Sequence, residues 1–288
     1  MKLAAAPISW GVCEVPGWGA QVSIDRVLSD AVALGMHAME SGPPGFLPAD
    51  PGEVRSLLGT RGMRLVGGFV TAILHDDSRR DAELDSVRRQ AEWLAAGGGE
   101  VLVLAPASGE TGYDARSVLD DRAWRSLFDG IAAVVTIADR YALTLAVHPH
   151  AGTAIATRAD VERFLAGSSA GLCLDTGHLF IGGSDPADLV RRFPRRIRHV
   201  HLKDVDAAMA ATLRSGGARY ADAVKRGLYR TLGDGDVGIE GVLYELERSG
   251  YRGWYVLEQD VALDESQAAE ASFPWIARSL EFVSARVA

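Results

Sequence analysis

Residues 197–204 read IRHVHLKD, a short apolar and β-branched run that ends in polar side chains. Successive side chains of a strand point to opposite faces, so His199, His201 and Lys203 would share one face. Asp204 follows at the carboxyl end of the run. The segment therefore predicts a strand whose carboxyl end carries chemically active groups, and similar runs recur along the chain.

Eight such runs alternate with amphipathic stretches, about one run per 36 residues of the 288-residue chain. This spacing is the length of a strand, a loop and a helix. Between the runs, stretches such as IDRVLSDAVALG at 24–35 repeat apolar residues at three- and four-residue intervals, which is typical of helices. The predicted strands are residues 3–8, 37–40, 64–70, 101–105, 143–148, 171–175, 197–202 and 254–258.

Unbroken alternation without a linker predicts one α/β domain spanning residues 1–288. Eight units favour a single (β/α)8 TIM barrel, and a doubly wound open sheet is the competing fold. Apolar residues make up 48% of the chain, enough to bury a sizeable core.

Charge and composition narrow the function classes. The net charge of −8 disfavours nucleic acid as a partner, because phosphate binding requires a basic face. No apolar run approaches the roughly 20 residues of a membrane-spanning helix, so no membrane partner is expected. The apolar stretch in the first residues, MKLAAAPISWG, is too short for a signal peptide. Two cysteines, Cys13 and Cys173, are too few for a framework of disulfide bonds. We expect a soluble, cytoplasmic enzyme.

An extended segment follows the seventh predicted strand. Residues 205–230 are too long for a simple strand-to-helix loop, so in a barrel they would lie over the mouth as a lid, or alternatively form a surface helix without a role. Exposed apolar positions within them could support a homo-oligomer. The following LGDGDVG at 232–238 lacks phosphate-loop spacing, and Asp234 and Asp236 would repel phosphate. We expect a tight turn there, with unusual backbone angles at Gly233 and Gly235.

Polar residues with metal-ligand chemistry end four successive runs. Because the carboxyl ends of barrel strands converge, these residues can form one site. Each histidine could instead be a hydrogen-bonded structural residue, but four such endings in a row favour a site. The mixture of imidazole and carboxylate suits a borderline divalent ion. The residues are His148 and His150, Asp175 and His178, His199, His201, Lys203 and Asp204, and Glu258 and Asp260.

Two residues at the ends of earlier runs have open assignments. Glu40, in AMESG, could be an acid or base, a substrate ligand or a helix-capping carboxylate. Trp10, in ISWG, could form a wall against an apolar ring face or belong to the core. The sequence has no GxSxG motif, and neither cysteine is flanked like a nucleophile, so covalent serine or cysteine hydrolysis is not expected.

Several motifs in order resemble a known family. The series HPHAGT (148–153), CLDTGH (173–178), HVHLKDV (199–205), LGDGD (232–236) and GWYVLEQD (253–260) resembles the xylose isomerase-like TIM-barrel superfamily of sugar isomerases and epimerases. Together with the opening APISWGV and the segment 205–230, it is most similar to the inosose dehydratases, which act on 2-keto-myo-inositol. The resemblance covers nearly the whole chain.

This resemblance implies one divalent metal ion held by strands five to eight. Mn²⁺ or Co²⁺ is favoured, and Zn²⁺ or Mg²⁺ is an alternative. The matching ligands are His148, Asp175, His201 and Glu258, with His148 or the neighbouring His150 standing where the commoner pattern has Glu. Epimerases of the superfamily use two glutamates as a pair of bases. Because only Glu258 of that pair is present, the replacement favours a lyase.

The implied reaction is metal-assisted dehydration of a keto-polyol, such as 2-keto-myo-inositol, through an enediolate. The base could be Glu258, His150 or Glu40, and the acid could be His178 or Lys203. The expected substrate contacts are Trp10, Glu40 and Lys203. The nearest alternative is a metal-dependent isomerase or epimerase acting on a keto sugar or keto-inositol. A zinc-cluster endonuclease is disfavoured by the negative charge, and a non-catalytic binding protein on the same scaffold is a further alternative.

Overall fold

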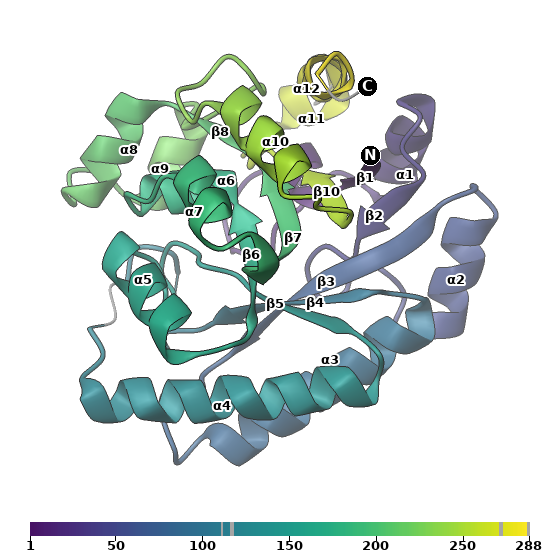
Figure 1. The fold of residues 1–288 in the computed structure, drawn as a ribbon. Coiled ribbons are helices and arrows are strands. Elements are labelled where there is room, and N and C mark those ends of the chain that lie inside the picture. Colours follow the sequence, from purple (N-terminus) through teal and green to yellow (C-terminus); the bar gives the residue numbers. More distant parts are fainter. Residues whose placement is uncertain (111, 116–117, 271–272, 287–288) are drawn as a thin grey trace.

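The computed structural model describes residues 1–110, 112–115, 118–270 and 273–286. Within them, eight parallel strands close into a barrel in the order β1-β10-β7-β6-β5-β4-β3-β2 (Figure 1). The predicted (β/α)8 barrel is confirmed, and the open-sheet alternative is wrong. The barrel strands are β1 (Lys2–Ala5), β2 (Ala38–Glu40), β3 (Arg64–Ala72), β4 (Val101–Pro106), β5 (Thr144–Val147), β6 (Gly171–Asp175), β7 (Ile197–Leu202) and β10 (Trp254–Leu257).

The strand bounds follow the sequence prediction most closely at β6 and β7, which have the predicted limits. The first strand differs, because it ends at Ala5 rather than at residue 8. The chain then turns into the short 3-10 helix η1 (Pro7–Trp10). Pro7 has no backbone N–H for a sheet ladder, and Gly11 ends the helix with a φ of 77°.

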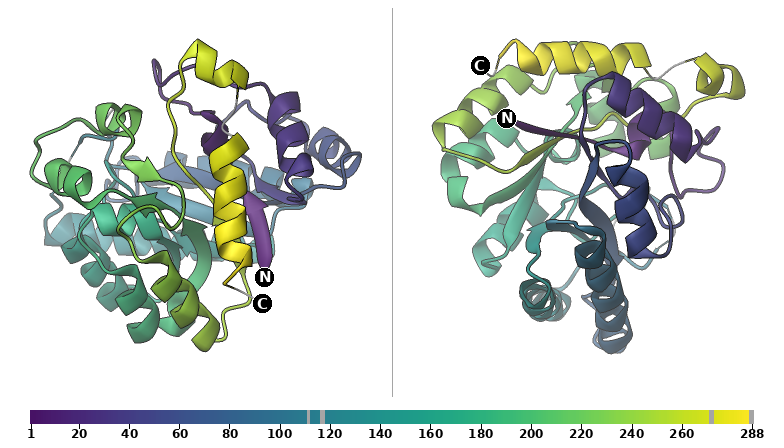
Figure 2. Two further views of the ribbon diagram at one scale, coloured as in Figure 1. Left: turned by 90° about the horizontal axis from the view of Figure 1, so that it is seen from above. Right: turned by 90° about the vertical axis from the view of Figure 1, so that its right-hand side faces the viewer.

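Helices surround the strands on the outside of the barrel (Figure 2). Several begin at a residue whose side chain accepts a hydrogen bond from the first turn, as Ser23, Asp50, Asp120 and Thr157 do. They are α1 (Ile24–Ala33), α2 (Pro51–Gly59), α3 (Arg80–Gly97), α4 (Asp121–Arg140), α5 (Arg158–Gly167), α6 (Thr176–Ile181), α7 (Pro186–Arg192), η2 (Pro194–Arg196), α10 (Ile239–Arg248), α11 (Glu265–Glu270) and α12 (Phe273–Ser284). No helix among the described residues has the length and apolar character needed to cross a membrane.

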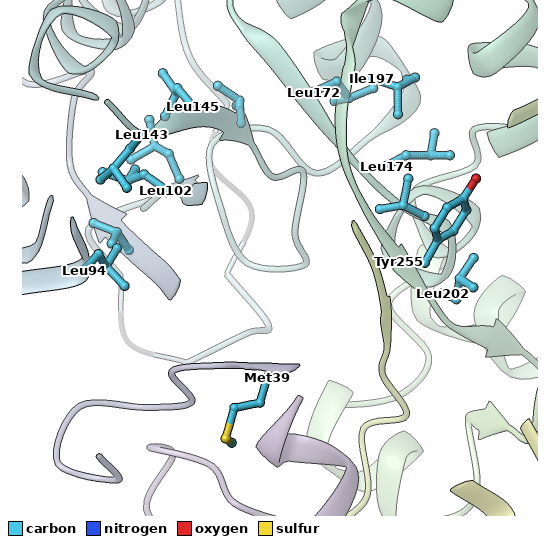
Figure 3. Close-up of a cluster of buried hydrophobic side chains, with 14 of the residues drawn as sticks. Met39, Leu94, Leu102, Leu143, Leu145, Leu172, Leu174, Ile197, Leu202 and Tyr255 are labelled. Carbon is cyan, nitrogen blue, oxygen red and sulfur yellow. The ribbon is translucent and has the colours of Figure 1, made fainter. Parts of the chain in front are cut away.

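Two layers of buried side chains hold the barrel together. The larger one includes Leu102, Leu172 and Leu174 and lies between strands and helices (Figure 3). The second, which includes Ala146, Cys173 and Val256, fills the interior. Since side chains two residues apart share a face, these interior residues are in phase with the strand-end His148, Asp175 and Glu258. The interior layer therefore forms the floor beneath the predicted site.

The extended segment after β7 contains a small antiparallel sheet and two helices: β8 (Asp204–Val205), α8 (Ala207–Arg214), α9 (Tyr220–Lys225) and β9 (Tyr229–Arg230). Figure 1 shows α8 and α9 beside α6, at the edge of the barrel. The segment is therefore largely helical, and its residues Tyr220 and Tyr229 are buried, while a role as a lid stays a prediction.

Asp204 anchors the LGDGDVG turn instead of facing the site. Its carboxylate accepts hydrogen bonds from the backbone N–H groups of Gly233 (2.8 Å), Gly235 (3.1 Å) and Val237 (3.1 Å). The expected unusual backbone angle is present at Gly233, with a φ of 91°. The same expectation for Gly235 is wrong. Glycine is needed there because a Cβ atom would collide with the Asp204 carboxylate.

Candidate active site

His201 lies at the centre of the strand-end cluster. Its Nδ1 is 2.7 Å from Glu258 Oε2 and 3.5 Å from Asp175 Oδ2. Its Nε2 is 3.1 Å from Glu40 Oε1. The side chains come from β2, β6, β7 and the residue after β10, so the closed barrel unites groups that are distant in sequence.

The donor atoms of Asp175, His201 and Glu258 suit a divalent cation. They lie within 4.8 Å of one another. Although His201 Nδ1 and Glu258 Oε2 are only 2.7 Å apart, both are buried and neither has a hydrogen-bond partner among the described residues. One nitrogen and two carboxylate oxygens are a common ligand set for catalytic metals. Cys173 lies nearby, but burial raises its pKa to about 11, so its protonated thiol is a poor ligand.

The charge of the cluster also favours a bound divalent cation. Glu40, Asp175, Glu258 and Asp260 are all buried or nearly so, and the Lys203 ammonium lies against three of them. Against the lowering effect of burial, the neighbouring carboxylates Glu40 and Glu258 raise the pKa of His201 well above its usual value. Buried negative charge requires compensation, and a bound cation would replace the proton on His201. The residues present therefore fit a divalent metal ion.

Glu40 orients the two histidines of β7. Its Oε1 accepts hydrogen bonds from His199 Nε2 at 2.7 Å and His201 Nε2 at 3.1 Å. Burial would raise the pKa of Glu40, but the two imidazoles hold it well below its usual range. With the proton of His201 held on Nε2, Nδ1 is free to bind a metal, as in carboxylate–histidine–metal arrangements. Glu40 lines the cavity, and the helix-cap alternative is wrong because Asp50 caps α2.

His148 lies directly beside the proposed ligands. Its Nε2 is 3.2 Å from Asp175 Oδ2, and its ring packs edge-on against Phe69 with centroids 5.6 Å apart. Burial lowers its pKa, which keeps the ring neutral, and its Nδ1 has no hydrogen-bond partner among the described residues. The geometry shows His148 orienting Asp175, and a direct role as a fourth ligand stays a prediction.

Lys203 forms a buried ammonium centre among three carboxylates. Its Nζ is 2.8 Å from Asp260 Oδ1, 3.2 Å from Glu258 Oε1 and 3.4 Å from Asp175 Oδ2. Burial alone would lower its pKa, but these carboxylates raise it well above the usual value, so the side chain stays charged. Asp260 was in phase with Glu258 in the sequence, but the sequence did not assign it this role.

The extended segment reaches the site through two tyrosines. Tyr220 donates a hydrogen bond from its hydroxyl to Asp260 Oδ2 at 2.9 Å, and the Tyr220 and Tyr229 hydroxyls are 2.7 Å apart. Lys203 Nζ lies 5.3 Å from the centre of the Tyr229 ring. These contacts extend the Lys203–Asp260 pair into the segment. Sequence reasoning missed both tyrosines, because an irregular segment has no periodicity that shows which side chains point inward.

His150 and His178 lie in close contact, with ring centroids 3.7 Å apart and ring planes tilted by 37°. His150 donates from Nδ1 to the Ala151 carbonyl at 2.7 Å, which leaves Nε2 as an acceptor on a ring that lines the cavity. Burial lowers the pKa of His150 to about 3, so the ring is neutral. His178 does not line this cavity. It lies behind His150, and its Nδ1 accepts from the Ala151 N–H, so the expected role as direct acid is not supported.

Trp10 does not reach the cavity either. Its side chain is 1% exposed, packs in the outer core and donates from Nε1 to Asp30 Oδ2 at 3.2 Å. The turn at η1 directs it away from the barrel mouth. Trp10 is therefore a core residue, and the expectation that it contacts the substrate is wrong. Trp18, which sequence reasoning missed, lines the cavity instead, with its Nε1 donating to the Val261 carbonyl at 2.8 Å.

The cavity has a volume of about 180 Å³. Cavities of roughly 150 Å³ hold benzene, so this space admits one six-membered ring. Tyr113 joins Trp18 at its rim and donates from its hydroxyl to Glu14 Oε1 at 2.7 Å. The lining combines polar groups with aromatic rings, which suits a ring that carries oxygen substituents.

Comparison with known proteins decides the family. A sequence model described as xylose isomerase-like TIM barrel matches residues 28–279. The chain belongs to this family. Among curated relatives, the inosose dehydratase of Geobacillus kaustophilus is 32% identical over 270 residues, which cover 90% of this chain and 87% of the relative. The inosose dehydratase of Erwinia tasmaniensis is 32% identical over 271 residues, covering 90% of each chain. The resemblance identified in the sequence is confirmed.

Solved structures share the fold at lower identity. An IolI protein with a bound zinc atom has a TM-score of 0.73 and 15% identity, covering 100% of this chain and 98% of its own. The 3-keto-D-glucoside 4-epimerase YcjR of E. coli has a TM-score of 0.70 and 18% identity, with 99% of each chain covered. The names of these relatives include dehydratases and epimerases, which agrees with the enzyme class expected from the sequence.

Proposed function

We propose that the chain is a metal-dependent lyase that dehydrates a six-membered ring keto-polyol such as 2-keto-myo-inositol. The main supporting observation is that the donor atoms of Asp175, His201 and Glu258 lie within 4.8 Å of one another, next to the buried Lys203 ammonium and a cavity of one-ring size. Inosose dehydratases as relatives over 90% of the chain support the same activity.

Asp175, His201 and Glu258 would hold the metal ion, with His148 as the candidate fourth ligand. Once bound, a divalent ion supplies Lewis-acid stabilisation of negative charge that develops on a substrate oxygen. Nitrogen ligands favour Mn²⁺, Co²⁺ or Zn²⁺ over Mg²⁺. The zinc in the IolI structure supports a divalent ion in this fold. Measurement of the metal content of the purified protein would distinguish among these ions.

Lys203 would bind a substrate hydroxyl or carbonyl oxygen. Its ammonium lines the cavity and is held in place by three carboxylates, so it offers a fixed positive charge with little reorganisation. A positive charge at this place stabilises the departure of a β-hydroxyl group as its oxygen gains negative charge. We therefore prefer Lys203 to His178 as the residue that assists departure of the β-hydroxyl group.

His150 is the preferred group for removing the proton next to the carbonyl. Its Nδ1–H is fixed on Ala151, so Nε2 carries the free lone pair, and its ring lines the cavity. Glu40 is less suited because its Oε1 already accepts from two imidazoles, and Glu258 is less suited because it would bind the metal. One base with one cationic group matches an elimination, which needs a base and a leaving-group partner.

A second candidate function is epimerisation or isomerisation of a keto sugar. It is favoured by the fold neighbours named 3-keto-D-glucoside 4-epimerase and L-ribulose 3-epimerase, which share the barrel. Both reactions begin with removal of the same kind of proton. They differ in whether the proton returns to carbon or a hydroxyl group leaves.

Incubation of the Mn²⁺-loaded protein with scyllo-inosose distinguishes the two. Dehydration produces a new α-dicarbonyl chromophore, whereas isomerisation produces an isomeric ketone without it. We expect the chromophore, and we expect His150→Gln to slow its formation at least 100-fold, which is the usual size of a lost general base. An isomeric ketone as the product would show that the second candidate is correct.

A further inference from the structure

A second hollow adjoins the catalytic cavity. It has a volume of about 900 Å³ and lies between the connection at residues 41–50 and helix α3. The two spaces share lining residues, so they adjoin one another. The shared residues are Gly42, Pro43, Pro44, Phe69, Thr71 and Gln90. We call the second space the α3 groove.

Polar groups mark the junction between the two spaces. Thr71 is exposed at the end of β3, and its hydroxyl has no hydrogen-bond partner in the part of the chain that the structure describes. Gln90 is half-buried and makes only long contacts from Nε2 to Ser86, at 3.4 and 3.5 Å. Its carbonyl oxygen is therefore free to accept a hydrogen bond. These groups suit an ether oxygen and hydroxyl groups passing through the junction.

Beyond the junction, the α3 groove is mainly apolar. Leu47, Pro48 and Trp93 contribute to its walls. Trp93 is held by a hydrogen bond from its Nε1 to the Ala49 carbonyl at 2.9 Å, which links α3 to the opposite wall. Glu83 and Arg89 also line the groove, so the fixed indole and the proline rings favour a flat, apolar group only on the wall formed by Leu47, Pro48 and Trp93.

We propose that the α3 groove binds an apolar substituent, linked through oxygen, on the ring that occupies the catalytic cavity. The catalytic cavity has room for one ring, so a group attached to that ring would lie outside it, and the junction leads to the α3 groove. The substrate class is then a six-membered ring ketone carrying an aryl or alkyl group, rather than a free keto-cyclitol alone. This inference rests on the proposed function for the position of the reacting ring.

Calorimetry on the Mn²⁺-loaded protein tests the subsite with two probes, phenyl β-D-glucopyranoside and methyl β-D-glucopyranoside. Burial of part of the phenyl ring should make the phenyl glucoside bind about tenfold tighter or more. Ser86, on α3, lines the groove but not the catalytic cavity. Ser86→Trp should fill the groove and bring the phenyl glucoside to the affinity of the methyl glucoside, and the matched Ser86→Ala should retain the difference.

Equal affinities of the two glucosides for the wild-type protein, or no measurable binding of the phenyl glucoside, would overturn the subsite. A phenyl preference that survives Ser86→Trp would overturn it as well, because the phenyl group would then lie elsewhere. Turnover of scyllo-inosose is measured separately. A phenyl preference without inosose turnover would support the groove while removing the proposed reaction on free inosose.

Discussion

Replacing Tyr220 with phenylalanine tests the link between the extended segment and the site. The change removes one hydroxyl, which donates to Asp260 Oδ2 at 2.9 Å and contacts the Tyr229 hydroxyl at 2.7 Å. Hydrogen bonds to charged groups contribute about 1.5–3 kcal/mol, and the acceptor left behind is buried. We therefore expect Tyr220→Phe to lower the free energy of unfolding by about 2 kcal/mol.

The same change should affect turnover through Lys203, because Asp260 holds the Lys203 ammonium at 2.8 Å on its other oxygen. We expect kcat to fall by roughly tenfold, which corresponds to about 1.4 kcal/mol, with a smaller change in KM. Urea unfolding measures the stability, and initial rates with scyllo-inosose measure kcat. Tyr113→Phe is the control, since its hydroxyl donates to the exposed Glu14 and does not contact Asp260.

A double-mutant cycle with Asp260→Asn makes the test sharper. If Tyr220 acts through Asp260, the two substitutions should be non-additive, with an interaction energy of about 1 kcal/mol or more. Additive effects on both stability and kcat would refute the reasoning. So would a Tyr220→Phe variant whose kcat and stability match those of Tyr113→Phe.

Three further predictions follow from single contacts. Glu40→Gln should weaken Mn²⁺ binding 10- to 100-fold by calorimetry, because the carboxylate orients His201; unchanged affinity would remove that role. Gly235→Ala should destabilise the protein by about 2 kcal/mol in urea unfolding, since the new Cβ collides with the Asp204 carboxylate, and an unaffected midpoint would contradict this packing. Trp10→Phe should lower thermal stability but leave KM for scyllo-inosose unchanged, because Trp10 packs in the core. A raised KM would show that Trp10 contacts the substrate after all.

The sequence was sufficient to predict the barrel and the centre of the site. Strand parity placed His199, His201 and Lys203 on one face, and barrel closure then required Asp175 and Glu258 to meet them. In the structure His201 Nδ1 lies 2.7 Å from Glu258 Oε2 and 3.5 Å from Asp175 Oδ2, whereas His199 contacts Glu40. Both inferences depend only on regular backbone geometry, which the alternation of residues in a strand expresses directly.

The loop residues could not be predicted in the same way. Trp10 and Trp18 are close in sequence, but the turn at η1 sends the first into the core and leaves the second at the cavity. Tyr220 faces Asp260 because of the path of the extended segment, which no periodic pattern describes. The role of Glu40 depended on a contact with His201 across the barrel, 161 residues away in sequence.

The central claim is that Asp175, His201 and Glu258 hold one divalent ion on which turnover depends. The most direct measurement is a titration of the chelator-stripped protein with Mn²⁺, following bound metal and scyllo-inosose dehydration in the same samples. We predict that both rise together and saturate at one ion per chain, and that Asp175→Asn weakens both. Full dehydration activity in the stripped protein, or metal binding that leaves the rate unchanged, would contradict the claim.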